Sequence, residues 1–188
     1  MTPEVASQIN LSKALSLGGW MSDRELVWLA TMVKDCDNIV EFGSFHGRST
    51  RALADNAPPT ARIWAVDPWN GDMIAEDGST LDQVNTFVMP QFIKNLWDHI
   101  DAGKVIPKRG FSCNFKAPVV MDMVFLDGDH RLVVVRKDIK RALDMLRIGG
   151  IICGHDYGHP GWPGVKQAVD ELLSNVQVED TIWWTLKY

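Results

Sequence analysis

Four segments of this chain share one pattern, in which an apolar, strand-like run ends in glycine or acidic residues. The segments are residues 39–50, 66–69, 125–130 and 149–157, and helix-like stretches separate them. Alternation of strands with helices is typical of a parallel sheet that is covered by helices on both faces. Open sheets of this kind bind small molecules at the carboxyl ends of their strands. The pattern therefore predicts an α/β fold with one binding pocket at that edge.

The size of the chain is that of one domain. Its 188 residues suffice for one well-buried α/β core and are too few for two ordinary ones. We expect a single domain over residues 1–188, in which residues 1–36 form an N-terminal helical cap region. Cys36, Cys113 and Cys153 are widely spaced, which predicts neither a disulfide framework nor a thiolate metal site.

Charge and hydropathy exclude several classes of partner. The formal net charge is -5, with 19 Lys and Arg against 24 Asp and Glu, and because the basic residues are scattered no nucleic-acid partner is expected. No segment approaches the roughly 20 apolar residues of a membrane span, and the N-terminus lacks the pattern of a signal peptide. We therefore expect a soluble, cytoplasmic protein without a membrane partner.

Local patterns place the elements along the chain. Apolar spacing and capping signals predict helices over residues 4–17, 22–33, 47–56, 81–100, 132–146 and 164–173. Strands are predicted from residue 39 and over residues 61–66, 105–107, 121–126 and 150–153. Residues 176–178 and 182–186 are expected to close the sheet as an antiparallel hairpin, with Trp183 and Trp184 packed on opposite faces. The polar stretch 68–80 is a candidate lid.

The turn after the first strand is bracketed by Gly43 and Gly47, where a missing side chain lets a ligand lie against backbone N–H groups. The glycines could equally serve the backbone alone. The turn is not a phosphate-binding P-loop, because it has one residue too few between the glycines and Arg48 in place of lysine. Glu41 lies inside the apolar run and needs a partner if buried. The ammonium of an amino-acid-like ligand would supply one.

The second strand ends at Asp67, where a carboxylate accepts hydrogen bonds from both ribose hydroxyls of a nucleoside. Trp69 is a candidate wall for the purine face. The alternative is an exposed aspartate at a strand end, followed by the helix-blocking Pro68.

Acidic residues and histidines gather at the ends of two further strands. Asp127, Asp129 and His130 follow the most apolar strand, and His155 and Asp156 follow the next one. Neighbouring parallel strands lie about 4.8 Å apart, so these side chains are expected around one point. Carboxylates suit Mg²⁺, and the histidines also allow a softer divalent metal. The alternatives are mutual charge compensation, or a helix N-cap formed by Asp129.

These motifs together resemble the class I S-adenosylmethionine-dependent methyltransferases. More narrowly, they resemble the small metal-dependent O-methyltransferases of the macrocin, novobiose and cephalosporin-pathway group. The resemblance extends from residues 19–22 to the terminal hairpin and implies a Rossmann-like seven-stranded sheet, mostly parallel, with an antiparallel C-terminal hairpin and helices on both faces. By this resemblance the residues that bind S-adenosyl-L-methionine are Glu41, Gly43, Ser44, Gly47, Ser49, Asp67, Trp69, Gly110, Phe111, Ser112 and Asp127.

The resemblance also implies a metal site and a base. Asp127 and Asp156 correspond to the family's Mg²⁺ ligands, and His155 stands where many members have Asp or Glu. The expected ligand set is Asp127, His155 and Asp156, with Mg²⁺ the expected ion and a softer metal or none left open by the histidine. Asp129 corresponds to the base, and His130 is a second candidate for that catalytic role.

The predicted function is O-methylation of a small hydroxylated molecule, a sugar or vicinal diol, assisted by a divalent metal. A nicotinamide-dependent oxidoreductase is the alternative enzyme, although the third glycine of its fingerprint is absent and the acidic cluster has no role in hydride transfer. A non-catalytic cofactor-binding module is the third reading. Substrate shape is expected to depend on residues 20–21, 68–80 and 159–163, and a homo-oligomer is left open.

Overall fold

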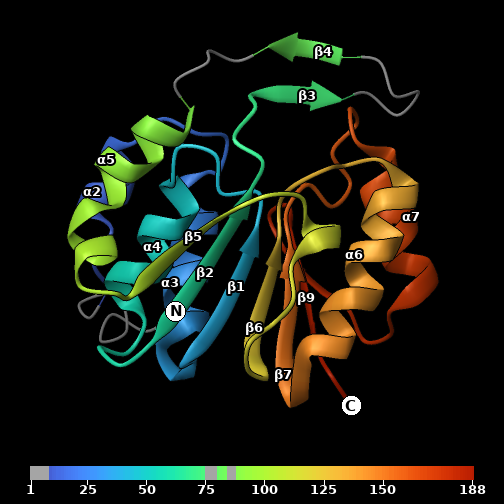
Figure 1. Cartoon of the computed structure of the whole chain (residues 1–188). Coiled ribbons are helices and arrows are strands. Elements are labelled where there is room, and N and C mark those ends of the chain that lie inside the picture. The colour runs from blue at the N-terminus through green and yellow to red at the C-terminus, as the bar shows by residue number, and fades with distance from the viewer. Residues whose placement is uncertain (1–8, 75–79, 84–87) are drawn as a thin grey trace.

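The computed structural model describes residues 9–74, 80–83 and 88–188. Within them, one seven-stranded sheet has the strand order β5-β2-β1-β6-β7-β9-β8 (Figure 1). Strands β1, β2, β5, β6 and β7 pair in parallel, whereas β9 pairs antiparallel with both β7 and β8. The predicted sheet with its closing antiparallel hairpin is therefore confirmed. The strands are β5 (Val105–Arg109), β2 (Arg62–Asp67), β1 (Asn38–Phe42), β6 (Met121–Leu126), β7 (Leu146–Gly154), β9 (Ile182–Leu186) and β8 (Gln177–Glu179).

Helices cover both faces of the sheet, as predicted (Figure 1). Alternate residues of each strand point to opposite faces, so that Ile39 of β1 packs in one core and Val40 in the other. Helices α3 (Asp23–Met32), α4 (Arg48–Asn56) and α5 (Val88–Asp101) contribute to the first core, together with the short α2 (Ser12–Ser16). Helices α6 (Leu132–Met145) and α7 (Pro163–Leu172) cover the second. The described residues also form two 3-10 turns, η1 (Val33–Asp35) and η2 (Ser112–Asn114).

The segment before α5 differs from the prediction. We expected a helix from residue 81, but residues 80–83 form strand β4 (Thr80–Gln83), which pairs antiparallel with β3 (Asp72–Ile74). This small sheet lies beyond the carboxyl ends of the main strands (Figure 1). Strand β3 lies inside the predicted lid, and its partner β4 lies mainly in the range that we expected to be helical. The helical spacing of the apolar residues does not reveal this pairing. Residues 75–79 of that range, and residues 4–8 of the first predicted helix, lie outside the described residues.

The C-terminal hairpin is fixed by two tryptophans that pack on opposite faces, as predicted. Trp183 is buried in the core beneath α6 and α7, and Trp184 packs against the other core, with its ring centroid 5.9 Å from that of Trp28. Gly154 leaves room for the Trp183 indole, since a Cβ there would lie 2.5 Å from its ring. In the part of the chain that the structure describes, no helix has the length and apolar character needed to cross a membrane.

Candidate active site

A cavity of about 1080 Å³ opens at the carboxyl ends of β1, β2, β6 and β7. Its walls are the turns that follow these strands, the loop after β5 and the segment before α3. Asp67 and Asp127 both line it, so the predicted convergence of strand ends on one pocket is confirmed. Other lining residues that the sequence singled out are Gly43, Ser44, Ser49, Gly110, Phe111, Ser112, Asp129, His130, His155 and Asp156.

The turn after β1 depends on its two glycines in different ways. Gly43 has a φ of +89°, and a Cβ there would lie 1.9 Å from the carbonyl oxygen of Asp127, so only glycine lets this turn approach the loop after β6. Gly47 has a φ of +88° and faces α5, where a Cβ would lie 2.3 Å from Leu96. Gly43 therefore shapes the cavity, whereas Gly47 shapes the packing behind it.

Glu41 is fully buried beneath this turn and is not among the described residues that line the cavity. Its carboxylate accepts hydrogen bonds from the hydroxyls of Ser44 and Ser49, each at 2.6 Å, and from that of Thr50. Burial raises its pKa to about 7, although these hydroxyls act in the opposite direction. The partners of Glu41 are therefore hydroxyl groups near the same turn, and not the ligand ammonium that we expected. Glu41 and the residues that carry these hydroxyls belong to the same sequence motif.

Asp67 ends β2 with its carboxylate already held by backbone donors. Oδ2 accepts the N–H of Phe45 at 2.9 Å and Oδ1 accepts that of Trp69 at 2.5 Å. Burial raises the pKa of the Asp67 carboxyl. Each carboxylate oxygen has a second lone pair, so the fixed side chain can still accept two hydroxyls of a ligand.

The Trp69 indole does not form the expected wall of the cavity. It is 4 % exposed and lies in the core, 4.9 Å from the ring of Phe92, and its Nε1–H donates to the Phe45 carbonyl oxygen at 2.9 Å. The residue has a φ of +46°, and this turn directs the side chain inward. The exposed ring of Phe111 lines the cavity instead.

The loop after β5 contributes one residue pair that the sequence did not reveal. Ser112 donates its hydroxyl hydrogen to Asp138 Oδ1 at 2.7 Å. Asp138 is a buried residue of α6 that also lines the cavity, and burial raises its pKa to about 6. The sequence signal that could have revealed this pair is an aspartate on the buried face of an amphipathic helix, since a buried carboxylate needs a hydrogen-bond partner.

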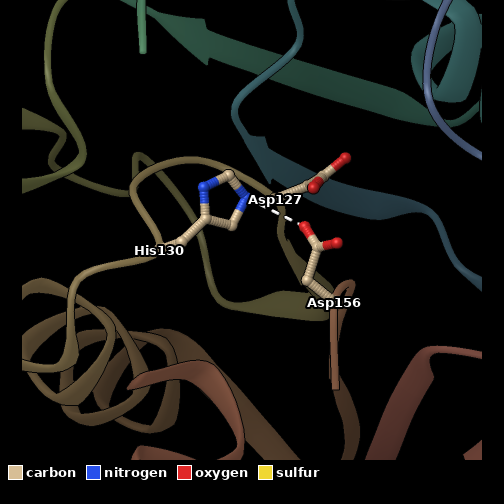
Figure 2. A group of neighbouring side chains, drawn as sticks. All are labelled: Asp127, His130 and Asp156. Atoms are coloured by element: carbon tan, nitrogen blue, oxygen red, sulfur yellow. Dashed lines mark ion pairs between the residues drawn. The ribbon is translucent and has the colours of Figure 1, made fainter. Parts of the chain in front are cut away.

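Asp127, His130 and Asp156 form a compact group at the ends of β6 and β7 (Figure 2). One ligand atom from each lies within 4.8 Å of the others, and His130 Nε2 lies 2.9 Å from Asp156 Oδ2. Although burial acts to raise it, the histidines His130 and His155 hold the pKa of Asp156 well below its usual range. Two carboxylates and an imidazole at this separation fit a divalent cation.

His155 stands behind this group in a different environment from the one expected. It is 7 % exposed, with Nε2 3.2 Å from Glu25 Oε2 and Nδ1 3.3 Å from Asp127 and 3.2 Å from Asp156. Burial alone would lower its pKa, but hydrogen bonds to the three carboxylates raise it to about 12. Both ring nitrogens of His155 face carboxylates, and among the described residues the group that could hold a cation contains His130 and not the expected His155.

Asp129 lies on the cavity wall in an ion pair with Arg131. Arg131 Nε lies 3.0 Å from both carboxylate oxygens, and the Arg131 backbone N–H donates to Oδ1 at 2.9 Å. In the described structure α6 begins at Leu132 without a side-chain cap. The N-cap of α6 is Arg131, so the alternative interpretation of Asp129 as the N-cap is wrong, and its carboxylate binds Arg131 instead.

The comparison with protein families identifies the chain. The model of a family described as a methyltransferase domain matches residues 40–157, which is more than half of the sequence and extends from within β1 to the residue after Asp156. The chain belongs to this methyltransferase family.

Solved structures confirm the fold of the methyltransferase. The tomaymycin-synthesis O-methyltransferase TomG of Streptomyces achromogenes, in complex with SAM, superposes with a TM-score of 0.65 at 15% identity, covering 100% of this chain and 91% of that one. The Bacillus cereus O-methyltransferase, in complex with SAH, gives 0.65 at 16% identity, with 100% and 92% covered. An rRNA methylase of Streptococcus thermophilus gives 0.59 at 15%, with 90% and 99% covered. A search of curated proteins found no relative.

Aromatic side chains surround the remaining part of the methyltransferase cavity. Trp20, 64 % exposed, packs on Phe45 with ring centroids 4.7 Å apart. The His130 ring stacks on Trp162 at 4.5 Å, and His159 lies on Trp162 at 6.5 Å. Trp20, His159 and Trp162 all line the cavity, and they belong to two of the three segments on which substrate shape was expected to depend.

Proposed function

We propose that the methyltransferase moves a methyl group from S-adenosyl-L-methionine to a hydroxyl oxygen of a small molecule. The observation that carries this proposal is the shared cavity: a carboxylate suited to a ribose, Asp67, and a cation-binding group around Asp127 line the same space of about 1080 Å³. The cofactors and activities named for the structural neighbours, among them O-methyltransferases with SAM or SAH bound, support the same assignment.

The cofactor is proposed to lie along the turns after β1, β2 and β5. Asp67 accepts the ribose hydroxyls, and the close approach at Gly43 leaves backbone next to the methionine part. Phe111 supplies an exposed aromatic face for the adenine, and Ser112 lies beside it at the cavity wall. Glu41, Gly47 and Trp69 act indirectly in this proposal, since they hold the shape of the turn from behind.

The charge balance around Asp127 favours a divalent cation. Glu25, Asp127 and Asp156 surround His155, so three carboxylates face one imidazolium and leave an excess of negative charge. Asp127, His130 and Asp156 would hold the ion. When bound, such a cation lowers the pKa of a coordinated hydroxyl and orients it. Mg²⁺ is the proposed ion, because two of the three ligands are carboxylates.

Asp129 is the proposed proton acceptor. It lies on the cavity wall beside the group formed by Asp127, His130 and Asp156, and it makes an ion pair with Arg131. The aromatic walls formed by Trp20 and Trp162 exclude water and hold the acceptor molecule in line with the methyl group. A small hydroxylated molecule fits this cavity, and the net charge of -5 argues against the RNA substrate named for one neighbour.

Methyl transfer from labelled cofactor tests the proposal directly. A panel of catechols, sugars and aliphatic vicinal diols is offered with Mg²⁺, with Mn²⁺ and with EDTA. We expect transfer to at least one class, supported by the metals and abolished by EDTA. Transfer that persists in EDTA would assign the proton acceptor to the His130–Asp156 pair, whose 2.9 Å contact has the geometry of a base with its orienting acid.

Calorimetric titration with S-adenosylhomocysteine and with NAD separates the methyltransferase from a nicotinamide-dependent enzyme. Binding of the former alone is expected. Binding of NAD alone would overturn the proposal, whereas cofactor binding without transfer to any panel member would support a non-catalytic module.

The proposed domain organisation follows from the same cavity. Gly18 to Ser22 precede α3 and line the cavity, with Trp20 packed on Phe45 of the turn after β1. Residues 1–36 are therefore proposed to act as a cap on a single domain of residues 1–188.

A further inference from the structure

Glu25 is a buried carboxylate that comes from outside the strand-end motifs. It lies at the third position of α3, in a capping box in which the Ser22 N–H donates to Oε2 at 2.7 Å and Ser22 Oγ accepts the Glu25 N–H at 3.3 Å. A capping-box glutamate ordinarily serves its own helix and faces solvent. Here the side chain is 3 % exposed, which indicates a further role.

The same carboxylate joins three distant parts of the chain. Oε1 accepts the Thr181 N–H at 3.2 Å and the Thr181 hydroxyl, and Oε2 lies 3.2 Å from His155 Nε2. The Thr181 contacts would hold Glu25 in place without any histidine. The Glu25 carboxylate, which is the acceptor for His155, is therefore already fixed by the turn between β8 and β9 and by the cap of α3.

The orientation of His155 follows from this contact. With Nε2–H directed at Glu25, Nδ1 is directed at Asp127 Oδ1 and Asp156 Oδ2, 3.3 and 3.2 Å away. These two aspartates belong to the group that fits a cation. In a buried site of low dielectric, hydrogen bonds to charged groups are strong and a missing partner is costly. Through these contacts the histidine fixes the positions of the Asp127 and Asp156 carboxylates relative to each other.

We propose that Glu25 is a positioning residue of the methyltransferase: through His155 it holds Asp127 and Asp156 in the arrangement that binds the divalent cation. This inference rests on the proposed function, and it adds a member from the N-terminal cap to a site otherwise built from strand ends. It also gives the cap region a role in the chemistry besides covering the cavity.

The test uses Glu25→Gln, which keeps the side-chain volume and leaves one oxygen for Thr181. Mn²⁺ affinity of the full chain is measured by calorimetry, and S-adenosylhomocysteine affinity is measured beside it. Loss of an outer-shell partner is expected to weaken Mn²⁺ binding about 10- to 100-fold, with cofactor affinity changed by less than about twofold. Unchanged Mn²⁺ affinity would overturn the proposal.

A double-mutant cycle shows whether the effect passes through His155. In a His155→Gln background, Glu25→Gln should produce no further loss of Mn²⁺ affinity, because the intermediary is already gone. Additive losses would mean that Glu25 acts only on the fold, and would contradict the proposal. Ser22→Ala is the matched control, since it removes the cap hydroxyl from the same helix end and leaves the His155 contact. It should lower stability without changing Mn²⁺ affinity.

A second measurement separates this inference from the proposed function. If the wild-type chain binds neither Mn²⁺ nor Mg²⁺, the metal part of the proposed function fails, and nitrogen-15 NMR of the histidine rings still tests Glu25. The Nε2–H signal of His155, assigned with His155→Gln, should be protected from exchange in the wild type and shifted or lost in Glu25→Gln. The same signal in both proteins would overturn the positioning role. Glu25→Asp, which shortens the reach, replaces Glu25→Gln if that variant does not fold.

Discussion

At the scale of single residues, the site separates groups that face the cavity from groups that hold them. Asp67, Asp127 and Glu25 line the cavity, whereas Glu41 is fully buried beneath the turn after β1. Glu25 and Glu41 are both buried carboxylates with protein groups as partners. A buried acid is costly unless it is hydrogen-bonded, and both glutamates are satisfied by hydroxyl, backbone or imidazole donors. Glu41 therefore supports the turn after β1, whereas Glu25 is proposed to support the group formed by Asp127, His130 and Asp156.

Asp127→Ala is expected to separate chemistry from cofactor binding. Methyl transfer should fall by at least about 100-fold, because the proposed cation ligand and a partner of His155 are both lost. S-adenosylhomocysteine affinity should change by less than about threefold, as measured by calorimetry. Asp144→Ala removes an exposed carboxylate of α6 and should keep full activity. Equal loss of activity and cofactor affinity in Asp127→Ala would show that the cluster is structural.

The contribution of Glu25 to the free energy of unfolding is expected to decrease at acid pH. Burial acts to raise its pKa, but hydrogen bonds from His155, Thr181 and Ser22 lower it from 4.5 to about 2. A carboxyl with a lowered folded-state pKa stabilises the fold above pH 4.5 and loses that contribution as the pH falls toward 2. At 1.36 kcal/mol per pKa unit the contribution is about 3 kcal/mol.

Urea unfolding of the wild type and of Glu25→Gln measures this contribution. The difference in unfolding free energy between the two proteins should be largest near neutral pH and should shrink steadily below pH 4.5. A difference that is independent of pH would mean that the carboxyl has no lowered pKa.

At the scale of elements, the hairpin of β8 and β9 is held against β7 by a matched pair of large and small residues. Trp183 is 1 % exposed and fills the space above Gly154, which lies directly opposite it in the antiparallel register. Dense cores tolerate extra volume poorly. The register of the last strand, and with it the position of Thr181 next to Glu25, depends on this fit.

Gly154→Ala should therefore destabilise the fold by overpacking. The added Cβ would lie 2.5 Å from the Trp183 ring, and the expected loss in unfolding free energy is about 1–3 kcal/mol, measured by urea denaturation. Gly18→Ala serves as the control, because a Cβ there meets no atom within 4 Å. A neutral Gly154→Ala would show that the indole can move aside at little cost.

At the scale of the whole molecule, one cavity is lined by turns that are far apart in the sequence. The cavity is lined by the segment before α3, by the turns after β1, β2, β5, β6 and β7, and by Thr181 of the last hairpin. A ligand that bridges these parts stabilises the folded state only, and the gain depends on its concentration relative to its dissociation constant.

S-adenosylhomocysteine at 100 times its dissociation constant should raise the unfolding free energy by about 2.7 kcal/mol. Thermal unfolding with increasing ligand measures this gain, which Asp67→Ala should reduce at the same ligand concentration. NAD at equal concentration should give no shift. Stabilisation by NAD instead would favour the oxidoreductase.

Much of this molecule could be predicted because its information is local in sequence. Apolar runs and their alternation with helices determine the parallel sheet, and the residues directly after each strand determine what reaches its carboxyl edge. Asp67, Asp127 and Asp156 were predictable for that reason. The wrong start of α5 arose because Thr80–Gln83 pairs with β3, and strand pairing between short segments leaves no periodic signal.

The sequence by itself determined the fold class, the cavity edge and the acidic groups that meet there. The tertiary structure alone decided the direction of each side chain: Trp69 into the core, Glu41 onto the hydroxyls of its own turn, His155 between carboxylates and His130 toward Asp156. It also brought Glu25 to the site from a helix far away along the chain. The physical reason is that a strand end specifies where a residue lies, whereas the partners of a buried polar group are chosen by whatever donors the packed fold places around it.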